Sequence, residues 1–136
     1  MAKNGGSETL PFLTIKNNTK MMNAEFEMTK DESIQFEKDY ERFSIIQDEN
    51  NFKTNWCLYE IEDINENTGL LADIMTDGYH NTIIVNLPNK KLTWLELWKY
   101  ADILFETIGN SDHMFIESFD VKKINGKREL QVFFGS

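Results

Sequence analysis

The sequence contains one cysteine, two prolines and no apolar run longer than a few residues. With Cys57 alone, no disulfide can form within the chain, so nothing indicates an oxidising compartment. No segment approaches the roughly 20 apolar residues of a transmembrane helix. The first residues hold no secretory signal, and Ala2 stands where N-myristoylation needs glycine. We therefore expect an intracellular protein without membrane contact, in the cytoplasm of a host or another cell, or in a virion assembled there.

Motifs of catalysis are also missing. The seven glycines form neither a phosphate-binding loop nor a dinucleotide-binding spacing. No serine lies in a nucleophile elbow, and no pair of cysteines or histidines has the short spacing of a zinc site. Cys57 follows Trp56 in a predicted strand, where a packed thiol is a better interpretation than a nucleophile. The sequence therefore predicts no cofactor and favours a protein without catalytic activity.

Basic residues are scarce over one long stretch. Residues 25–77 hold 15 Asp and Glu against 4 Lys and Arg, a net charge of −11. Residues 1–24 add +2, from 3 bases and 1 acid, and residues 78–136 add 0, from 7 of each, which gives the total of −9. Because a phosphate binder needs cations to displace counterions, the acidic half is not expected to bind DNA, RNA or an anionic membrane directly. This charge distribution favours a protein partner, self-association, or both.

Aromatic and aliphatic residues, by contrast, are plentiful. They make up 40% of the 136 residues and include 10 Phe, 3 Trp and 4 Tyr. This is enough apolar material for the core of one domain of ordinary size. Residues 1–9 are small and polar, and we expect a flexible N-terminal arm there. Residues 10–136 are expected to form a single α+β domain.

The first part of that domain shows strand and helix signals. Strands are predicted at residues 10–16 and at 22–28, where apolar and polar residues alternate in the second. Thr29 and Glu32 form a capping box, in which each side chain accepts a hydrogen bond from the other residue's backbone N–H. The helix that follows should occupy roughly residues 30–42.

A hairpin is predicted after this helix. If Asn50–Asn51 forms a two-residue turn, Phe43 faces Leu58 across the pair of strands. Residues 69–75 are ambiguous between a helical turn and a short strand. Residues 82–87 contain four aliphatic residues and end at Pro88, which predicts a buried strand.

The second half holds the most distinct signals. Thr93 and Glu96 form another capping box, and Gly109 can close the last turn, so a helix is predicted over residues 94–108. Asn125–Gly126 is the strongest short-range signal for a hairpin. This hairpin pairs Val121 with Leu130, Phe119 with Val132, and Lys122 with Glu129.

These segments together predict an α+β fold. Its two main helices should pack on a mixed or antiparallel sheet of about six to seven strands. A strand, a capped helix and an Asn-turned hairpin occur in this order twice, over residues 22–62 and 82–134. The repetition suggests a pseudo-symmetric βαββ pair.

One group of residues suggests a metal-dependent or acid–base site. It combines His80 with Asp112, His113 and Glu117, which are residue types that ligate Zn²⁺ or transfer protons. The spacings are not diagnostic, so a chance gathering of loop residues is the better interpretation and no metal is predicted. Glu117 stands out because the hairpin register places it on the apolar face of Phe119, where its pKa should be raised unless a cation or solvent is near.

Other residues fit an interaction protein better. Leu95 and Ile103 project away from the apolar stripe of the second helix. The helix is then covered on both sides or offers apolar contacts to another chain, unless these are the single exposed aliphatic residues that are ordinary on protein surfaces. Four bases surround the turn of the last hairpin: Lys122, Lys123, Lys127 and Arg128. They are either edge-protecting residues in solvent or a basic knob that meets an acidic surface. The acids proposed for such a surface are Glu37, Glu41, Glu60, Glu62 and Asp63.

The C-terminal segment, residues 112–136, carries a resemblance. Residues 112–119 read Asp-His-Met-Phe-Ile-Glu-Ser-Phe, and the chain ends in Phe-Phe-Gly-Ser after the hairpin. This combination resembles the tail of uncharacterised small proteins of large DNA viruses and phages. The resemblance implies a virion component or a host-directed accessory factor, and it implies no activity or site residue.

Three functional hypotheses remain. The leading one is a non-catalytic protein-interaction or structural module that works through its surface and can self-associate. The second is an acidic inhibitor that mimics the phosphates of nucleic acid and occupies a DNA- or RNA-binding protein. The third is a metal-dependent hydrolase that uses His80, His113 and nearby acids.

Overall fold

The computed structural model describes residues 28–79, 82–109 and 112–136, and these residues form two helices and five strands. In chain order they are α2 (Lys30–Asn50), β1 (Asn55–Trp56), β2 (Ile74–Asp77), β3 (Ile84–Asn86), α3 (Trp94–Ile108), β4 (Phe115–Ile124) and β5 (Lys127–Gly135). The α+β class is confirmed, but over these described ranges the sheet has five strands instead of six or seven. The arm predicted at residues 1–9 and the strand at 10–16 lie outside the described residues, as does nearly all of the strand at 22–28.

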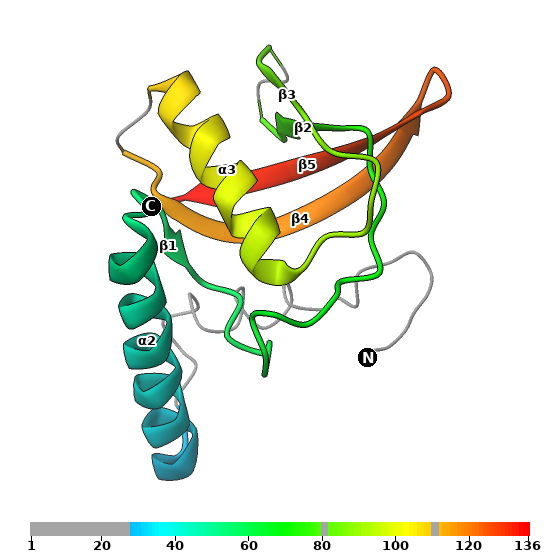
Figure 1. Cartoon of the computed structure of the whole chain (residues 1–136). Coiled ribbons are helices and arrows are strands. Elements are labelled where there is room, and N and C mark those ends of the chain that lie inside the picture. The colour runs from blue at the N-terminus through cyan, green and yellow to red at the C-terminus, as the bar shows by residue number, and fades with distance from the viewer. Residues whose placement is uncertain (1–27, 80–81, 110–111) are drawn as a thin grey trace.

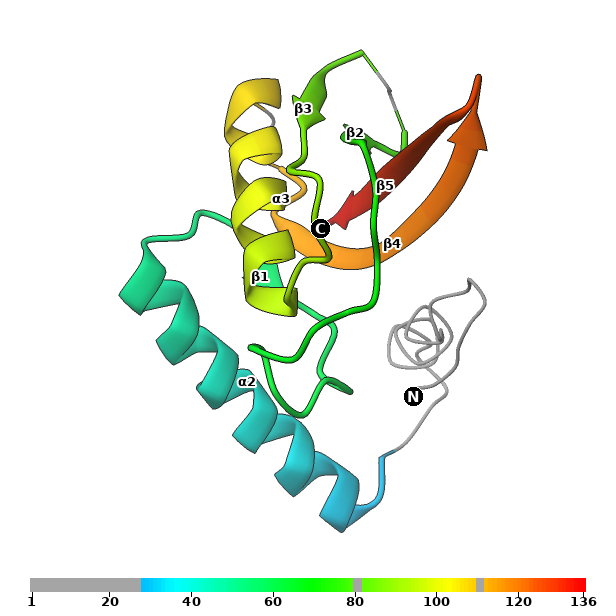
Figure 2. The same cartoon turned by 45° about the vertical axis from the view of Figure 1, so that its right-hand side comes forward.

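The sheet is mixed, with the strand order β1-β4-β5-β2-β3. β4 and β5 form an antiparallel hairpin at its centre, β1 and β2 add to that hairpin in parallel, and β3 pairs antiparallel with β2. Helix α3 lies across one face of the sheet, and α2 stands beside β1 (Figure 1). The N-terminal half of α2 reaches well beyond the sheet in both side views (Figure 2).

Helix α3 begins and ends where its local sequence predicts. Thr93 and Glu96 make the reciprocal capping bonds, with backbone N–H to side-chain oxygen distances of 2.9 and 3.1 Å. Gly109 adopts a left-handed conformation, φ 77°, and its N–H donates to the carbonyl of Phe105. A residue without a Cβ is favoured at such a cap.

The hairpin of β4 and β5 is also confirmed. Asn125 and Gly126 both have positive φ, 52° and 80°, as the two-residue turn requires. The three predicted cross-strand pairs are present, namely Val121 with Leu130, Phe119 with Val132, and Lys122 with Glu129.

Helix α2 is longer than predicted, and the hairpin predicted after it does not form. The helix continues past residue 42 to Asn50, and Asn51 closes it in a left-handed conformation with φ 57°. Because asparagine tolerates this conformation both in hairpin turns and at helix ends, the Asn-Asn pair was compatible with either. The predicted pairing of Phe43 with Leu58 is therefore wrong. The βαββ repeat is absent from the described residues, since its first hairpin is replaced by helix.

β1 and β3 take positions that the sequence did not predict. Trp56 of β1 pairs in parallel with Ile116 of β4, sixty positions along the chain. Residues 82–87 were predicted as a buried strand, but β3 is the edge of the sheet and Ile84 is 56% exposed. The edge is short, and Pro88 follows it closely, which limits pairing with other chains.

Aromatic rings from both helices and the sheet form the centre of the core. The ring centroid of Trp56 lies 5.1 Å from that of Trp98 on α3, 6.3 Å from Phe43 on α2 and 6.0 Å from Phe119 on β4. These four side chains are almost completely buried. Tilted aromatic pairs at such separations stabilise a core beyond the burial of their area.

A buried carboxylate ties α3 to the segment that enters β1. Only 7% of Asp102 on α3 is exposed, although its side chain is ionisable. Its Oδ1 accepts hydrogen bonds from the N–H groups of Lys53 and Thr54 and from the Thr54 hydroxyl, at 2.7–2.9 Å. The Thr54 hydroxyl accepts in turn from the indole N–H of Trp98. This network fixes the start of β1 against α3.

We expect the substitution Asp102→Ala to lower the free energy of unfolding by about 2–4 kcal/mol, because it leaves buried N–H groups unpaired. Urea denaturation followed by tryptophan fluorescence measures the change. Glu106→Ala, at an exposed position of the same helix, is the control and should change stability by less than about 0.5 kcal/mol. Equal effects of the two substitutions would show that the network does not stabilise the fold.

Candidate interaction surface

Among the described residues, helix α2 packs on the domain along one side only. Phe43 is its single buried residue, and Phe36 adds an edge contact to the ring of Tyr59, with centroids 5.3 Å apart. On the opposite side, Ile34 and Ile45 are 42% and 51% exposed. They lie eleven residues apart, about three helical turns, so they project from the same side of the helix.

Carboxylates outnumber bases among the exposed side chains of α2. Six acids of α2 are exposed: Asp31, Glu32, Glu37, Glu41, Asp48 and Glu49. Against two exposed bases, Lys30 and Lys38, they give the exposed side chains of the helix a net charge of −4. We call this exposed side of α2, with Ile34 and Ile45, the acidic face. The predicted acids Glu37 and Glu41 lie on it.

The loop after β1 is acidic as well. The predicted residues Glu60, Glu62 and Asp63 are exposed there, and so is Glu66. The loop is tied to α2, because the Arg42 guanidinium donates to the carbonyls of Ile61 and Glu62. The acids of the loop and those of α2 therefore belong to the same region of the molecule.

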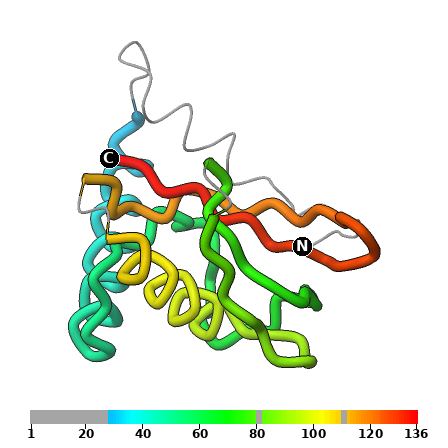
Figure 3. The backbone as a smooth tube through the Cα atoms, turned by 90° about the horizontal axis from the view of Figure 1, so that it is seen from above, coloured from blue at the N-terminus to red at the C-terminus, as the bar shows by residue number. Residues whose placement is uncertain are grey.

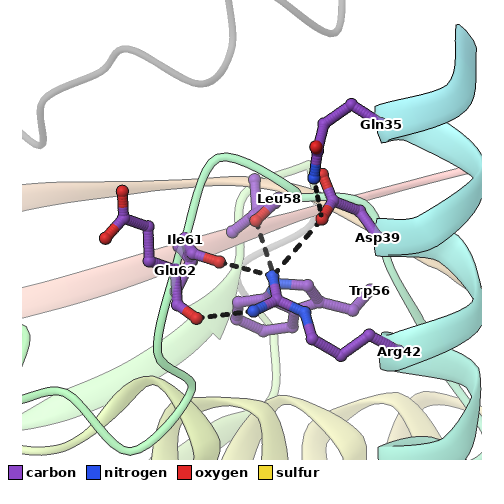
Figure 4. Close-up of polar contacts among 7 residues, drawn as sticks. All are labelled: Gln35, Asp39, Arg42, Trp56, Leu58, Ile61 and Glu62. Carbon is purple, nitrogen blue, oxygen red and sulfur yellow. Dashed lines mark hydrogen bonds and ion pairs between the residues drawn. The ribbon is translucent and has the colours of Figure 1, made fainter. Parts of the chain in front are cut away.

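Arg42 is the polar anchor of α2 (Figure 4). Its two terminal nitrogens donate to the carbonyls of Glu62 at 2.5 Å and Ile61 at 2.7 Å. Asp39 lies 3.7 Å from one of them and accepts a hydrogen bond from the Gln35 amide. A guanidinium suits this place because its planar fork can satisfy two carbonyls and a carboxylate at once.

The last turn of α2, like that of α3, carries acid and no base. It contains Asp48 and Glu49 and no basic residue. The C-terminus of a helix carries a partial negative charge, which favours cations and disfavours carboxylates nearby. The next base along the chain, Lys53, makes no ion pair within the described part of the chain. This end of the acidic face is therefore a favourable place for a cation from outside the chain.

Basic residues gather at the turn of the β4–β5 hairpin. Residues 122–128 contain four bases and no acid, and Lys122, Lys123 and Lys127 are exposed. None of these lysines forms an ion pair with a described residue, whereas Arg128 is half-buried and lies 3.9 Å from Asp73. We call residues 122–128 the basic tip. Seen from above, the basic tip and α2 lie at opposite ends of the molecule (Figure 3).

The two aliphatic residues singled out on α3 have different environments. Ile103 is 49% exposed. Leu95 is only partly exposed, packs against the core, and donates its N–H to the carbonyl of Ile64. They therefore do not form a shared apolar patch.

Of the residues considered for a metal site, Asp112, His113 and Glu117 lie in the described part of the chain. Asp112 and His113 are exposed, and His80 lies outside the described residues. The described ranges contain no group of three or more His, Cys, Asp and Glu side chains that could hold a metal ion.

Glu117 is not on the apolar face where the register placed it. A bulge interrupts the ladder, so that Ile116 pairs with Phe134 and Ser118 with Phe133, and Glu117 has no position opposite it. Its carboxylate lies against Gly135, where a Cβ would have no room. Burial raises the pKa of this carboxyl, and the charge of His113 opposes the rise.

Cys57 lies beside this bulge and is a poor nucleophile. Its N–H donates to the carbonyl of Ile116. Burial, together with the nearby charge of Glu117, raises the pKa of the thiol to about 12, although a hydrogen bond with Tyr59 works in the other direction. Because the thiolate is the reactive form, the packed-thiol interpretation fits this environment better than a catalytic one.

The anchoring role of Arg42 predicts that Arg42→Lys lowers the free energy of unfolding by about 1–2 kcal/mol, since one ammonium cannot replace the fork. Backbone amides of α2 should then exchange hydrogen faster than those of α3. Lys38→Ala removes an exposed base of the same helix and serves as control. Unchanged exchange in α2 would show that Arg42 does not hold the helix.

The raised pKa of Cys57 predicts slow modification by a thiol reagent such as DTNB. At pH 8 a thiol with a pKa of about 12 is ionised to about one part in 10⁴. In urea the pKa returns to its ordinary value, and the reaction should become at least about 100-fold faster. A native protein that reacts as fast as the unfolded chain would contradict the geometry described above.

Neither of the helices in the described part of the chain has a stretch long and apolar enough to cross a membrane. Comparisons of the sequence with protein-family models and with curated proteins, and of the structure with solved structures, find no match. The acidic face of α2 and the basic tip are therefore the two candidate sites on the surface of the molecule.

Proposed function

We propose that this protein is a non-catalytic interaction module that binds another protein chain through the acidic face of α2. The observation that supports the proposal is the exposure of Ile34 and Ile45 on one side of a helix that docks on the domain with its other side. Apolar side chains at the centre of a polar surface are the usual composition of a protein interface. Because the two isoleucines are separated by about three helical turns, a partner that contacts both would lie along a large part of the helix.

The charges of the last turn support the same proposal. Asp48 and Glu49 oppose the dipole of α2 at its C-terminal end, where basic residues would stabilise the isolated helix. Natural proteins tolerate such local costs where function requires them. A partner with basic residues would remove the cost when it binds. In a viral setting, which the C-terminal resemblance implies, the partner would belong to a particle or to the host.

A second candidate function is mimicry of nucleic acid. The exposed carboxylates of α2 and of the loop at 60–66 form an anionic surface that a DNA- or RNA-binding protein could accept. This mechanism depends on the carboxylates alone. Binding through the acidic face depends on the isoleucines as well, which separates the two hypotheses.

To test the proposal, the full chain is immobilised and the proteins that it retains from its native source are compared with those retained by Ile34→Glu/Ile45→Glu. The double variant should lose at least about 90% of the retained protein, because charges replace the apolar centre of the contact. Ile103→Glu, at a similarly exposed position of α3, should retain it. Equal retention by both variants would contradict the proposal.

The same assay distinguishes the mimic. Glu37→Gln, Glu41→Gln and Glu62→Gln together preserve shape and remove three charges. If this triple variant loses all binding, duplex DNA displaces the retained protein, and the double isoleucine variant still binds, then mimicry replaces the interaction module as the function.

A further inference from the structure

The chain carries a surface that complements its own acidic face. Resting on the function proposed above, we infer that the partner of the acidic face is the basic tip of a second copy of this chain. In this arrangement Ile124 of one copy packs on Ile45 of the other, and lysines of the tip meet the carboxylates around Ile45. Two isoleucines and two sets of opposite charges carry the inference.

The basic tip has an apolar centre. Ile124 is 44% exposed, and Lys127 is its cross-strand partner in the hairpin. Lys122 lies two residues before Ile124 on the same strand, so the three side chains project from the same face of the ribbon. The tip thus presents one isoleucine between two ammonium groups.

The last turns of α2 present the opposite arrangement. Ile45 is 51% exposed, and its acidic neighbours on the helix surface are Glu41, four residues before it, and Asp48 and Glu49, three and four residues after it. The one basic neighbour is Arg42, whose guanidinium donates to loop carbonyls. All three acids are exposed. An isoleucine between carboxylates therefore matches an isoleucine between lysines, with an apolar centre and a charged rim on both surfaces.

The charges of the two surfaces are opposite. The exposed side chains of α2 sum to −4, from six acids and two bases, and the exposed side chains of the basic tip sum to +3, from three lysines. The contact would place Lys122 and Lys127 at the helix end that lacks a base of its own. Interaction with the helix dipole adds to the attraction between the ionised side chains there.

The fold prevents this contact within one chain and permits it between two. The basic tip and α2 lie at opposite ends of the molecule in the side view and in the view from above (Figures 1 and 3). Two copies that lie antiparallel bring each tip to the other's helix. A two-fold axis then makes both contacts at once and closes the assembly as a dimer, because the same two surfaces are used on each copy.

Analytical ultracentrifugation of the full chain at low ionic strength tests the inference. We expect the wild-type protein to be a dimer. Lys122→Glu/Lys127→Glu should weaken dimerisation at least about 100-fold, because each reversal replaces an attraction by a repulsion in both contacts. Glu41→Lys/Glu49→Lys should weaken it in the same way. Combining all four substitutions restores the opposite charges and should restore the dimer.

Ile103→Glu is the matched control and should remain dimeric, whereas Ile45→Glu should be monomeric. Circular dichroism checks that each variant is folded. If a charge variant does not fold, the wild-type protein still tests the inference, because its dissociation constant should rise with salt between about 50 and 500 mM. A monomeric wild-type protein, a dimer insensitive to salt, or a four-fold variant that stays monomeric would overturn the inference.

The result also separates this inference from the proposed function. A monomeric wild-type chain that retains other proteins through Ile34 and Ile45 overturns self-association and leaves the interaction module intact. A monomeric chain that retains no protein contradicts both.

Discussion

The packing of both helices on the sheet depends on the buried indole of Trp56. It lies in the two-residue strand β1 and meets Phe43 of α2, Trp98 of α3 and Phe119 of β4 within 6.3 Å between ring centroids. Its N–H donates to the carbonyl of Leu58, so the ring is buried without an unpaired donor. Since β1 is only two residues long, its two pairing positions on β4 are too few to fix the strand in the sheet by themselves. The aromatic contacts and the Asp102 network fix it there.

This arrangement explains why α2 has a free side. The ring of Phe43 packs on Trp56, and the preceding residue, Arg42, donates hydrogen bonds to the loop at 61–62. Both contacts lie on the same side of α2, in its C-terminal half. A helix gains most of its stability from packing, and here that packing is confined to one narrow stripe. The capping box at Thr29 and the left-handed cap at Asn51 support the rest, so the acidic face stays helical without being covered.

Local sequence signals predicted one half of the fold well and the other half poorly. The capping box at Thr93, the glycine cap at residue 109 and the Asn-Gly turn depend only on neighbouring residues, so α3 and the last hairpin were predictable. The hairpin predicted at Asn50–Asn51 was wrong because the left-handed conformation of Asn51 suits a helix cap and a hairpin turn equally. The parallel pairing of β1 depends on contacts distant in sequence. The bulge at Glu117 does not show in the alternation of polar and apolar residues along the strand. Asp102 is buried because its carboxylate accepts hydrogen bonds from Thr54, which is far from it in sequence. The acids and lysines of the candidate surfaces were identifiable from composition, whereas their separation to opposite ends required the fold.

That separation determines which orientations of two copies are possible. Each chain carries a net charge of −9, so two copies repel one another at long range, and salt screens this repulsion beyond about 8–10 Å. Parallel copies would bring two acidic faces together and add local repulsion to the general one. Antiparallel copies place each basic tip on an acidic face, and only then do close pairs act against the repulsion. The net charge thus disfavours indiscriminate association, while the position of the two charged surfaces at opposite ends of the molecule permits one specific orientation.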